Sequence, residues 1–179
     1  MMTPEQLRDG IFSLNTRRFG TVAEIMVKKL KSLGKALNLF HDLFDNSTNQ
    51  RIEVKFSRVG QNLDKLTEEN LLDCIKKEVG TDRRVSFADW SSHKFLCNIQ
   101  QVKKTEFDIL YYGMFFDDCI KIFKIFPSQI DSTIGYANKQ HKGNVGEGQF
   151  HITEKNLQSH LEKFYVQSLT YEELLGLLK

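Results

Sequence analysis

Apolar and polar residues alternate in short runs at several places along the chain, and this period of two predicts β-strands. The clearest case is the segment 51–57, where positions 52, 54 and 56 are apolar and the positions between them are polar. The segment 107–116 is apolar almost throughout, which predicts a central strand covered on both faces. The strands predicted in this way are 36–44, 51–59, 107–116 and 119–126.

Elsewhere apolar residues recur at helical spacing. The first helix opens with a capping box, because Thr3 can cap it, Pro4 suits its first position and Gln6 can bond back to the cap. Residues 15–19 interrupt the apolar stripe, so a second helix is predicted over 20–33 and ended by Gly34. The later helices are predicted from Thr67 to Gly80, with Leu71, Leu72, Ile75 and Val79 as the buried face, then over 153–167 and over 171–178.

The order of these elements predicts a single α/β domain with a mixed central β-sheet flanked by helices. The chain has 179 residues and only two prolines, so its length suits one core and no proline-rich linker divides it.

Composition adds few constraints. The net charge of +2 is nearly neutral, which neither supports nor excludes a nucleic-acid partner. The sequence has no run of 18 apolar residues and no secretion signal, so no membrane partner is expected. The three cysteines are far apart and make neither a disulfide framework nor a zinc site, which favours a reducing cytoplasm.

Candidate chemistry gathers around the 51–57 strand. Glu53 and Lys55 lie two positions apart and therefore face the same side, roughly 6–7 Å from each other along the strand. Asp42 and Asp45 lie 11 and eight positions before Glu53, and the polar segment between them and the strand has the composition of a turn. A hairpin would return one of the two aspartates to Glu53.

Paired acids beside a lysine are typical of metal-dependent phosphodiester cleavage. Mg²⁺ takes oxygen ligands and usually only one or two protein carboxylates. It binds phosphate oxygens, activates water and neutralises developing charge. The lysine is a compact charge that can steady the phosphate or the water. The alternative is an ordinary solvated strand face with a weak ion pair.

The spacing resembles the motif of the PD-(D/E)XK nuclease superfamily. Asp42 matches the first acid of that motif, Glu53 the second acid and Lys55 the lysine. The chain departs from the pattern because His41, and no proline, precedes the aspartate, and Asp45 remains a rival for the first acid. For most of its length, the order of elements is similar to that of a small type II restriction endonuclease. This similarity implies a catalytic core over about 20–126, followed over 127–179 by a DNA-recognition segment and the C-terminal helices.

The resemblance implies a Mg²⁺-dependent enzyme that cleaves double-stranded DNA at a specific sequence, with Asp42 and Glu53 binding the metal. It also implies that a glutamate on the helix before the hairpin, here Glu24, reaches the metal through water. The alternative for Glu24 is a salt-bridged solvated face with Lys28. Cleaving both strands at a palindrome implies a homodimer.

Recognition of DNA is expected from the segment 136–151, which has three glycines, no periodicity, and residue types that contact phosphates and base edges. The alternative is a mobile surface loop. Arg83 and Arg84 form a second basic candidate site. The candidate DNA-binding residues are Lys139, Gln140, His141, Lys142, Asn144, Gln149, Arg83 and Arg84.

Two other functions stay open from the sequence. One is a repair or recombination nuclease that recognises DNA structure and needs no dedicated recognition segment. The other is a non-catalytic nucleic-acid-binding protein that does not use Glu53 as a metal ligand.

Overall fold

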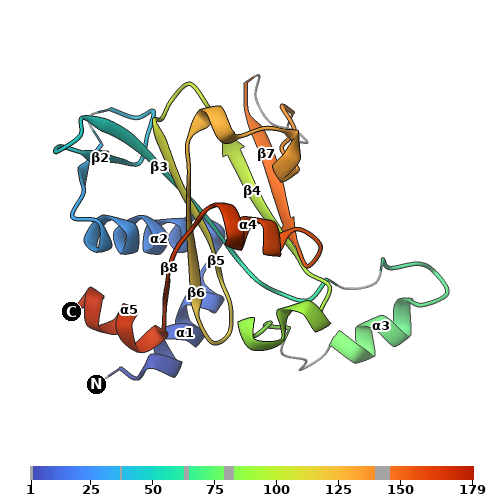
Figure 1. Ribbon diagram of the computed structural model, residues 1–179. Helices are drawn as coiled ribbons and strands as arrows, with labels where there is room; N and C mark the ends of the chain where they lie inside the picture. The colour runs from blue at the N-terminus through green and yellow to red at the C-terminus, as the bar shows by residue number, and fades with distance from the viewer. Residues whose placement is uncertain (1, 37, 63–64, 79–82, 140–145) are drawn as a thin grey trace.

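The computed structural model describes residues 2–36, 38–62, 65–78, 83–139 and 146–179, and Figure 1 shows their arrangement. They form a single α/β domain around a six-stranded sheet with strand order β1-β2-β3-β5-β6-β8. β3 and β5 are parallel and the other neighbours are antiparallel, so the sheet is mixed, as predicted. The strands are β1 Gly34–Lys35, β2 Leu43–Asp45, β3 Gln50–Arg58, β5 Ile109–Phe115, β6 Ile120–Ile125 and β8 Tyr165–Leu169.

Both faces of the large sheet are covered. Alternate residues of β5 point to opposite faces, and all seven are buried. Ile109 and Phe115 join the core formed with the helices α1, α2 and α5, whereas Leu110 and Tyr112 join the core formed with a second, two-stranded sheet and α4. This second sheet pairs β4 Leu96–Val102 with β7 Gly148–Thr153 in antiparallel fashion.

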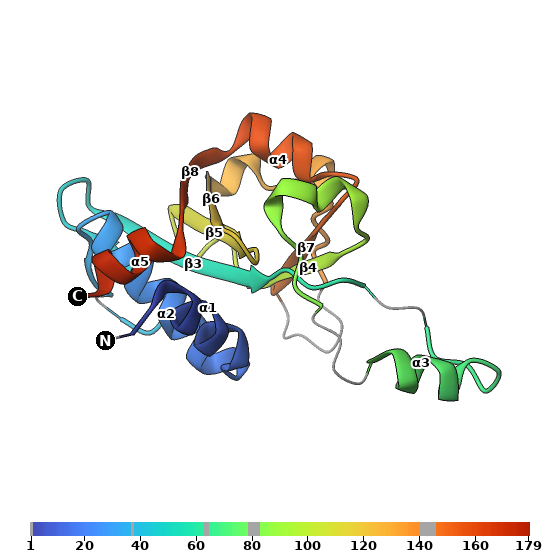
Figure 2. The same ribbon diagram turned by 90° about the horizontal axis from the view of Figure 1, so that it is seen from below.

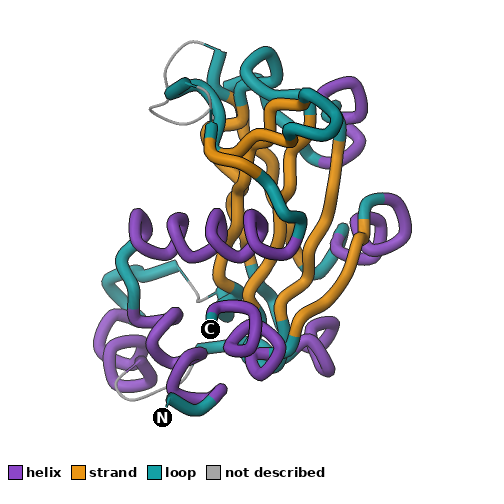
Figure 3. Tube along the Cα trace, turned by 90° about the vertical axis from the view of Figure 1, so that its left-hand side faces the viewer, coloured by secondary structure: helices purple, strands orange, loops and turns teal. Residues whose placement is uncertain are grey.

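The helices are arranged around this core. The long helix α2 runs across the strands (Figure 3), and Figure 2 shows α1 and α2 on one side of β3 and α4 on the other. The α-helices are α1 Pro4–Ser13, α2 Thr16–Leu30, α3 Leu71–Glu78, α4 Leu157–Lys163 and α5 Tyr171–Leu178. The short 3-10 turns are η1 Phe87–Ser92, η2 Pro127–Gln129 and η3 Ser132–Ile134.

Several sequence predictions are confirmed. The capping box of Thr3 and Gln6 is present at the start of α1, and the strands predicted at 51–59, 107–116 and 119–126 correspond to β3, β5 and β6. The last helix corresponds to α5. The parts of the chain predicted from strong periodicity are therefore where they were expected.

Other boundaries were wrong. Helix α2 begins at Thr16 because Asn15 accepts a hydrogen bond from the backbone of Arg18 and caps it, so the segment 15–19 starts the helix where an interruption was predicted. The described residues of the segment 36–44 do not form one strand: within it only Leu43 and Phe44 belong to β2, which is three residues long, and Asp42 lies immediately before it. The helix predicted over 153–167 ends at Lys163, and Tyr165–Leu169 is an edge strand beside β6.

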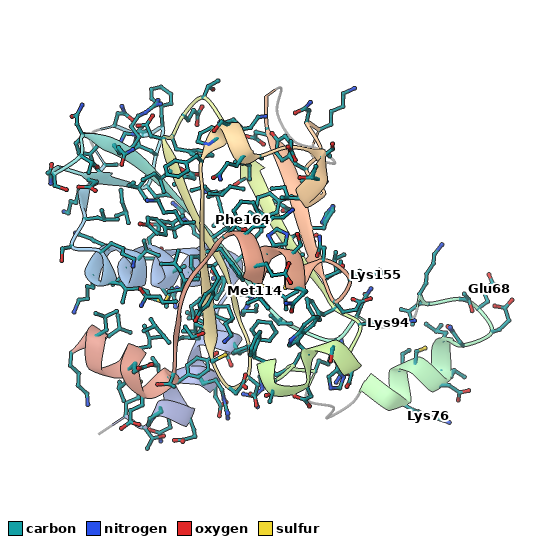
Figure 4. The ribbon with its side chains drawn as sticks, in the orientation of Figure 1. Glu68, Lys76, Lys94, Met114, Lys155 and Phe164 are labelled. Atoms are coloured by element: carbon teal, nitrogen blue, oxygen red, sulfur yellow. The ribbon has the colours of Figure 1, made fainter. Side chains whose placement is uncertain are left out.

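The apolar face predicted for α3 is not buried. Leu71, Leu72 and Ile75 are exposed, and Val79 and Gly80 lie outside the described residues. Figure 4 shows why, since Glu68 and Lys76 mark an arm that extends from the body, whereas Met114 and Phe164 lie within it. Helical spacing of apolar residues gave the correct helix but could not show whether that helix lies against the core.

Among the described residues, no helix is both long and apolar enough to cross a membrane.

Candidate active site

The β2–β3 hairpin places Asp42 opposite Glu53. Leu43 pairs with Ile52, and the Asp42 amide continues the ladder by donating to the Ile52 carbonyl at 3.1 Å. At Val54, the residue after Glu53, the hydrogen bond to β3 comes from the Asp42 side chain and not from backbone. The Asp42 Oδ2 accepts a hydrogen bond from the backbone amide of Val54 at 2.9 Å. A short β2 is therefore what positions this carboxylate at the edge of β3.

Lys55 joins the two acids. Its ammonium forms ion pairs with the carboxylate of Glu53 and, at 3.4 Å, with Oδ2 of Asp42. Glu53 and Lys55 face the same side of β3, next to Leu110 and Tyr112 of β5. The structure thus brings together three of the four candidate catalytic residues from a segment of 14 positions, 42–55.

The start of β3 is held in place from its other side. The Arg51 guanidinium donates to both carboxylate oxygens of Asp108, at 3.1 and 2.8 Å, and the Arg51 backbone amide donates to the same side chain at 2.8 Å. A bidentate pair fixes geometry as well as charge. It anchors β3 beside β5 two residues before Glu53.

Glu53 is the most buried of the three site residues. Its side chain is 12% exposed, and its Oε2 has no hydrogen-bond partner among the described residues. Burial raises the pKa of Glu53 to about 7, because removal from water and the nearby Asp42 charge outweigh the opposing effect of Lys55. A buried carboxylate oxygen without a donor is poorly stabilised unless it binds a proton or a cation.

Lys55 stays charged in this setting. Burial lowers the pKa of Lys55, but the carboxylates of Glu53 and Asp42 raise it by more, so the net change is upward. The site therefore contains a fixed ammonium beside one carboxyl whose proton is held weakly near neutral pH.

Glu24 approaches this group from α2. It is half-buried, and its pKa is raised by burial and by the charge of Asp42, although Lys55 acts in the opposite direction. The two charges that act on Glu24 belong to the hairpin, so the helix before the hairpin brings a third acid toward the site. The contact of Glu24 with a metal through water, which the resemblance implied, stays a prediction.

Asp45 does not join the site. Its Oδ1 accepts hydrogen bonds from the backbone and hydroxyl of Ser47, at 2.8 and 2.6 Å, and lies 3.4 Å from the Thr48 amide. These bonds close the turn of the hairpin and lower the pKa of Asp45 to about 2. Of the two rival aspartates, Asp42 contacts Lys55 and Asp45 shapes the turn.

A cleft of about 470 Å³ opens beside this group, between α2 and β4. One wall contains Arg17 and Glu24 of α2, the floor includes Lys55 of β3, and the other wall is formed by β4. Three polar residues of β4 line it: Asn98, Gln100 and Gln101. All three were missed from the sequence because no strand was predicted there. The available signal was the pattern of the segment 96–102, in which Cys97 and Ile99 alternate with polar residues.

The predicted DNA-binding residues are less completely described. Lys139 is exposed and Gln149 is half-buried in β7, where Gln149 exchanges backbone hydrogen bonds of 2.8 and 3.0 Å with Ala137. Gln140, His141, Lys142 and Asn144 lie outside the described residues.

Arg83 and Arg84 line a different cavity, of about 450 Å³, together with Arg58. Arg84 forms ion pairs with Asp9 and, at 3.3 Å, with Asp117. These contacts tie Arg84 to α1 and to the turn after β5, and neither Arg83 nor Arg84 lines the cleft beside Lys55.

The residues present suit a hard divalent cation. Among the described residues, no group of three or more His, Cys, Asp or Glu side chains has the arrangement of a protein-only metal cage. Mg²⁺ needs less, because it keeps several waters and commonly uses only one or two carboxylates. Asp42 and Glu53 supply that number, and the buried Oε2 of Glu53 has no hydrogen-bond partner in the part of the chain that the structure describes.

No known protein-family model matches the chain, and comparisons with characterised proteins and with solved structures found no significant similarity.

Proposed function

We propose that this protein is a Mg²⁺-dependent DNA endonuclease of the PD-(D/E)XK type, acting at a specific sequence as restriction enzymes do. The observation that carries the proposal is the contact of Lys55 with both Asp42 and Glu53, with Glu24 close by and a polar cleft alongside. Two acids and an ammonium at one strand edge meet the needs of phosphodiester hydrolysis.

Asp42 and Glu53 would hold the metal. When bound there, Mg²⁺ would neutralise charge on the scissile phosphate and make a water more acidic. For this the Glu53 carboxyl has to give up its proton, which its pKa of about 7 allows at neutral pH. The Val54 amide keeps the Asp42 carboxylate in position through their 2.9 Å hydrogen bond.

Lys55 would orient the attacking water or steady a phosphate oxygen. Its ammonium is charged and already directed at both carboxylates, so it needs little rearrangement when a phosphate enters the cleft. Glu24, whose raised pKa reflects burial and the charge of Asp42, would accept hydrogen bonds from waters at this site.

The partners follow from this chemistry. The substrate would be double-stranded DNA, and two copies of the chain would act together in the cytoplasm. The segment 136–151, including Lys139 and Gln149, would contribute to recognition.

The test is digestion of a plasmid with and without Mg²⁺, with EDTA as the metal-free arm. We expect Asp42→Ala, Glu53→Ala and Lys55→Ala each to reduce cleavage by on the order of 10³-fold or more, while most DNA binding is kept. Asp45→Ala is the matched control, since it removes a carboxylate from the same hairpin but outside the Lys55 contact.

Three results would argue against the proposal. Cleavage that persists in EDTA would show that the reaction needs no metal ion. Full activity of Glu53→Ala would show that this group is not the active site. DNA binding by the parent chain without any cleavage would instead favour a non-catalytic nucleic-acid-binding protein.

A further inference from the structure

β4 contains a β-bulge at the cleft. Ile99 pairs with Phe150 and Val102 pairs with Gly148, so three steps along β4 match only two along β7. The extra residue falls at Gln100 and Gln101, and the backbone of Gln101 adopts a φ of 58°. A left-handed conformation is uncommon for a residue that is neither glycine, asparagine nor aspartate. Bulges are frequent beside active sites, where they redirect a side chain.

The bulge changes which side chains reach the surface. Along β4, Cys97, Ile99 and Val102 are buried in the core. The strict alternation of a strand would also bury the side chain of Gln101. Instead Gln100 and Gln101 are both exposed, and both line the cleft that also contains Lys55. The backbone irregularity thus presents two adjacent amides to the candidate active site.

We propose that Gln100 and Gln101 read base edges of DNA next to the scissile phosphodiester. This inference rests on the proposed function, which it extends to specificity. A glutamine amide carries a donor and an acceptor side by side, the pattern that pairs with the N6 and N7 edge of adenine in the major groove. Two adjacent amides suit an A·T pair within the target.

The surroundings fit a groove-reading element. β4 and β7 form a two-stranded ribbon, and the major groove is wide enough to admit such a ribbon. Apart from the exposed Leu96 at its start, the outer face of β4 is polar: Asn98 is exposed, and its Oδ1 lies 2.5 Å from Nδ1 of His151 on β7. The opposite wall of the cleft presents Arg17, which is exposed and suited to a phosphate.

The experiment selects bound molecules from a library of random DNA duplexes, with Ca²⁺ replacing Mg²⁺ so that binding is read without cleavage. The test variants are Gln100→Ala with Gln101→Ala together, and Gln101→Asn, which keeps an amide and tolerates a left-handed backbone. Gln158→Ala is the matched control, because Gln158 is an exposed amide on α4 and does not line the cleft. Circular dichroism melting of each variant checks that it is folded.

We expect the parent and Gln158→Ala to enrich the same sequence. The double variant should lose preference at one or two adjacent base pairs by about 10- to 100-fold, with affinity for random DNA nearly unchanged. Gln101→Asn should shift the preference at no more than one base pair. If melting shows the double variant to be unfolded, Gln100→Ala alone is expected to relax one base pair.

The outcomes separate this inference from the proposed nuclease. A folded double variant that enriches the parental sequence would overturn the role of Gln100 and Gln101, whether or not the parent cleaves DNA. A parent that enriches no sequence would overturn it too, even with cleavage intact. Suppose that the double variant has an altered sequence preference but the parent does not cleave DNA in Mg²⁺. This result would support the role of Gln100 and Gln101 in recognition and would refute the proposed nuclease activity.

Discussion

The proton on Glu53 links the candidate site to the stability of the fold. In an unfolded chain this carboxyl has its ordinary pKa of 4.5, whereas burial raises it to about 7 in the structure. The folded state therefore favours the protonated form. The stability that this proton contributes is fully present below pH 4.5 and is lost as pH rises through 7. The full difference corresponds to roughly 3 kcal/mol.

We expect metal-free protein to melt at a lower temperature at pH 8 than at pH 5, and Glu53→Gln to reduce this loss because its amide does not ionise. Added Mg²⁺ should stabilise the parent at pH 8 more than it stabilises Glu53→Gln. Calorimetric melting of both proteins at both pH values makes the measurement. Equal losses in parent and variant would show that the Glu53 carboxyl does not carry the effect.

The parent has to be compared with Glu53→Gln because His160 also makes the stability depend on pH. Burial lowers the pKa of His160 to about 4, so its neutral form favours the fold and that contribution is lost as pH falls from 6.5 through 4. This acts against the Glu53 trend at the acidic end. The difference between parent and Glu53→Gln removes the His160 contribution, which is common to both.

At the same scale, the sequence predicted the residue types of the site but left open which aspartate belongs to it. Asp42 and Asp45 are three positions apart, and either could face Glu53 if the turn shifted. The choice depends on the turn, where Ser47 and Thr48 bind the Asp45 carboxylate. Such local hydrogen bonds depend on backbone geometry that residue spacing does not specify.

At the scale of elements, the central strands hold the site through close packing at Gly113. A Cβ placed there would lie 2.3 Å from the Lys121 carbonyl of β6 and 2.3 Å from the Phe56 ring of β3. One of these neighbours is backbone, so the contact cannot be relieved by a side-chain rotation. Phe56 directly follows Lys55, and a displaced β3 would disturb the candidate site as well.

We therefore expect Gly113→Ala to destabilise the protein by about 1–3 kcal/mol or more. Gly10→Ala in α1 is the matched control, since nothing lies within 4 Å of its Cβ, and alanine there should stabilise the helix by roughly 0.5–1 kcal/mol. Urea unfolding measures both. Equal stability of the two variants would mean that the sheet relaxes around the added methyl group.

Elements with uninterrupted patterns could be predicted, and those with local exceptions could not. β5 was predicted because every residue of it is apolar or small and buried. β4 was missed because the bulge at Gln100 and Gln101 breaks its alternation. β8 was missed because Leu161 and Phe164 continue the apolar spacing of α4 up to the residue before the strand, which predicts a longer helix. Pairing with β6 makes this segment a strand, and such a contact is not local in sequence.

At the scale of the whole molecule, the α/β class could be predicted because it depends only on the order of strands and helices. The placement of the cleft could not, because it arises where α2, β3 and β4 meet. These elements are separated by tens of residues in the sequence. The exposure of Leu72 on α3 was equally out of reach, since the same apolar pattern serves a buried or a projecting helix.

The proposed function requires two copies of the chain to act on the two strands of DNA. Within the part of the chain that the structure describes, one group brings Lys55 into contact with Asp42 and Glu53, and under the proposed function one such group would cleave one strand. The two strands of a palindromic target are related by a two-fold axis, so two copies arranged about that axis would present one site to each strand. We expect the protein part of the DNA complex to have a mass of about 42 kDa by light scattering, after subtraction of the DNA mass, which is twice the 20.8 kDa of the chain.

A mixed dimer gives the sharper test. Co-expressing the parent with Glu53→Ala, under two different affinity tags, allows the heterodimer to be purified. One active subunit should cut only one strand in each encounter, so supercoiled plasmid should accumulate as the nicked circle before it becomes linear. The parent homodimer should yield linear DNA directly, and a heterodimer of the parent with Asp45→Ala should do the same. Linear product from the Glu53→Ala heterodimer at the parental rate, or a monomer mass on DNA with double-strand cleavage intact, would show that one chain is sufficient to cut both strands.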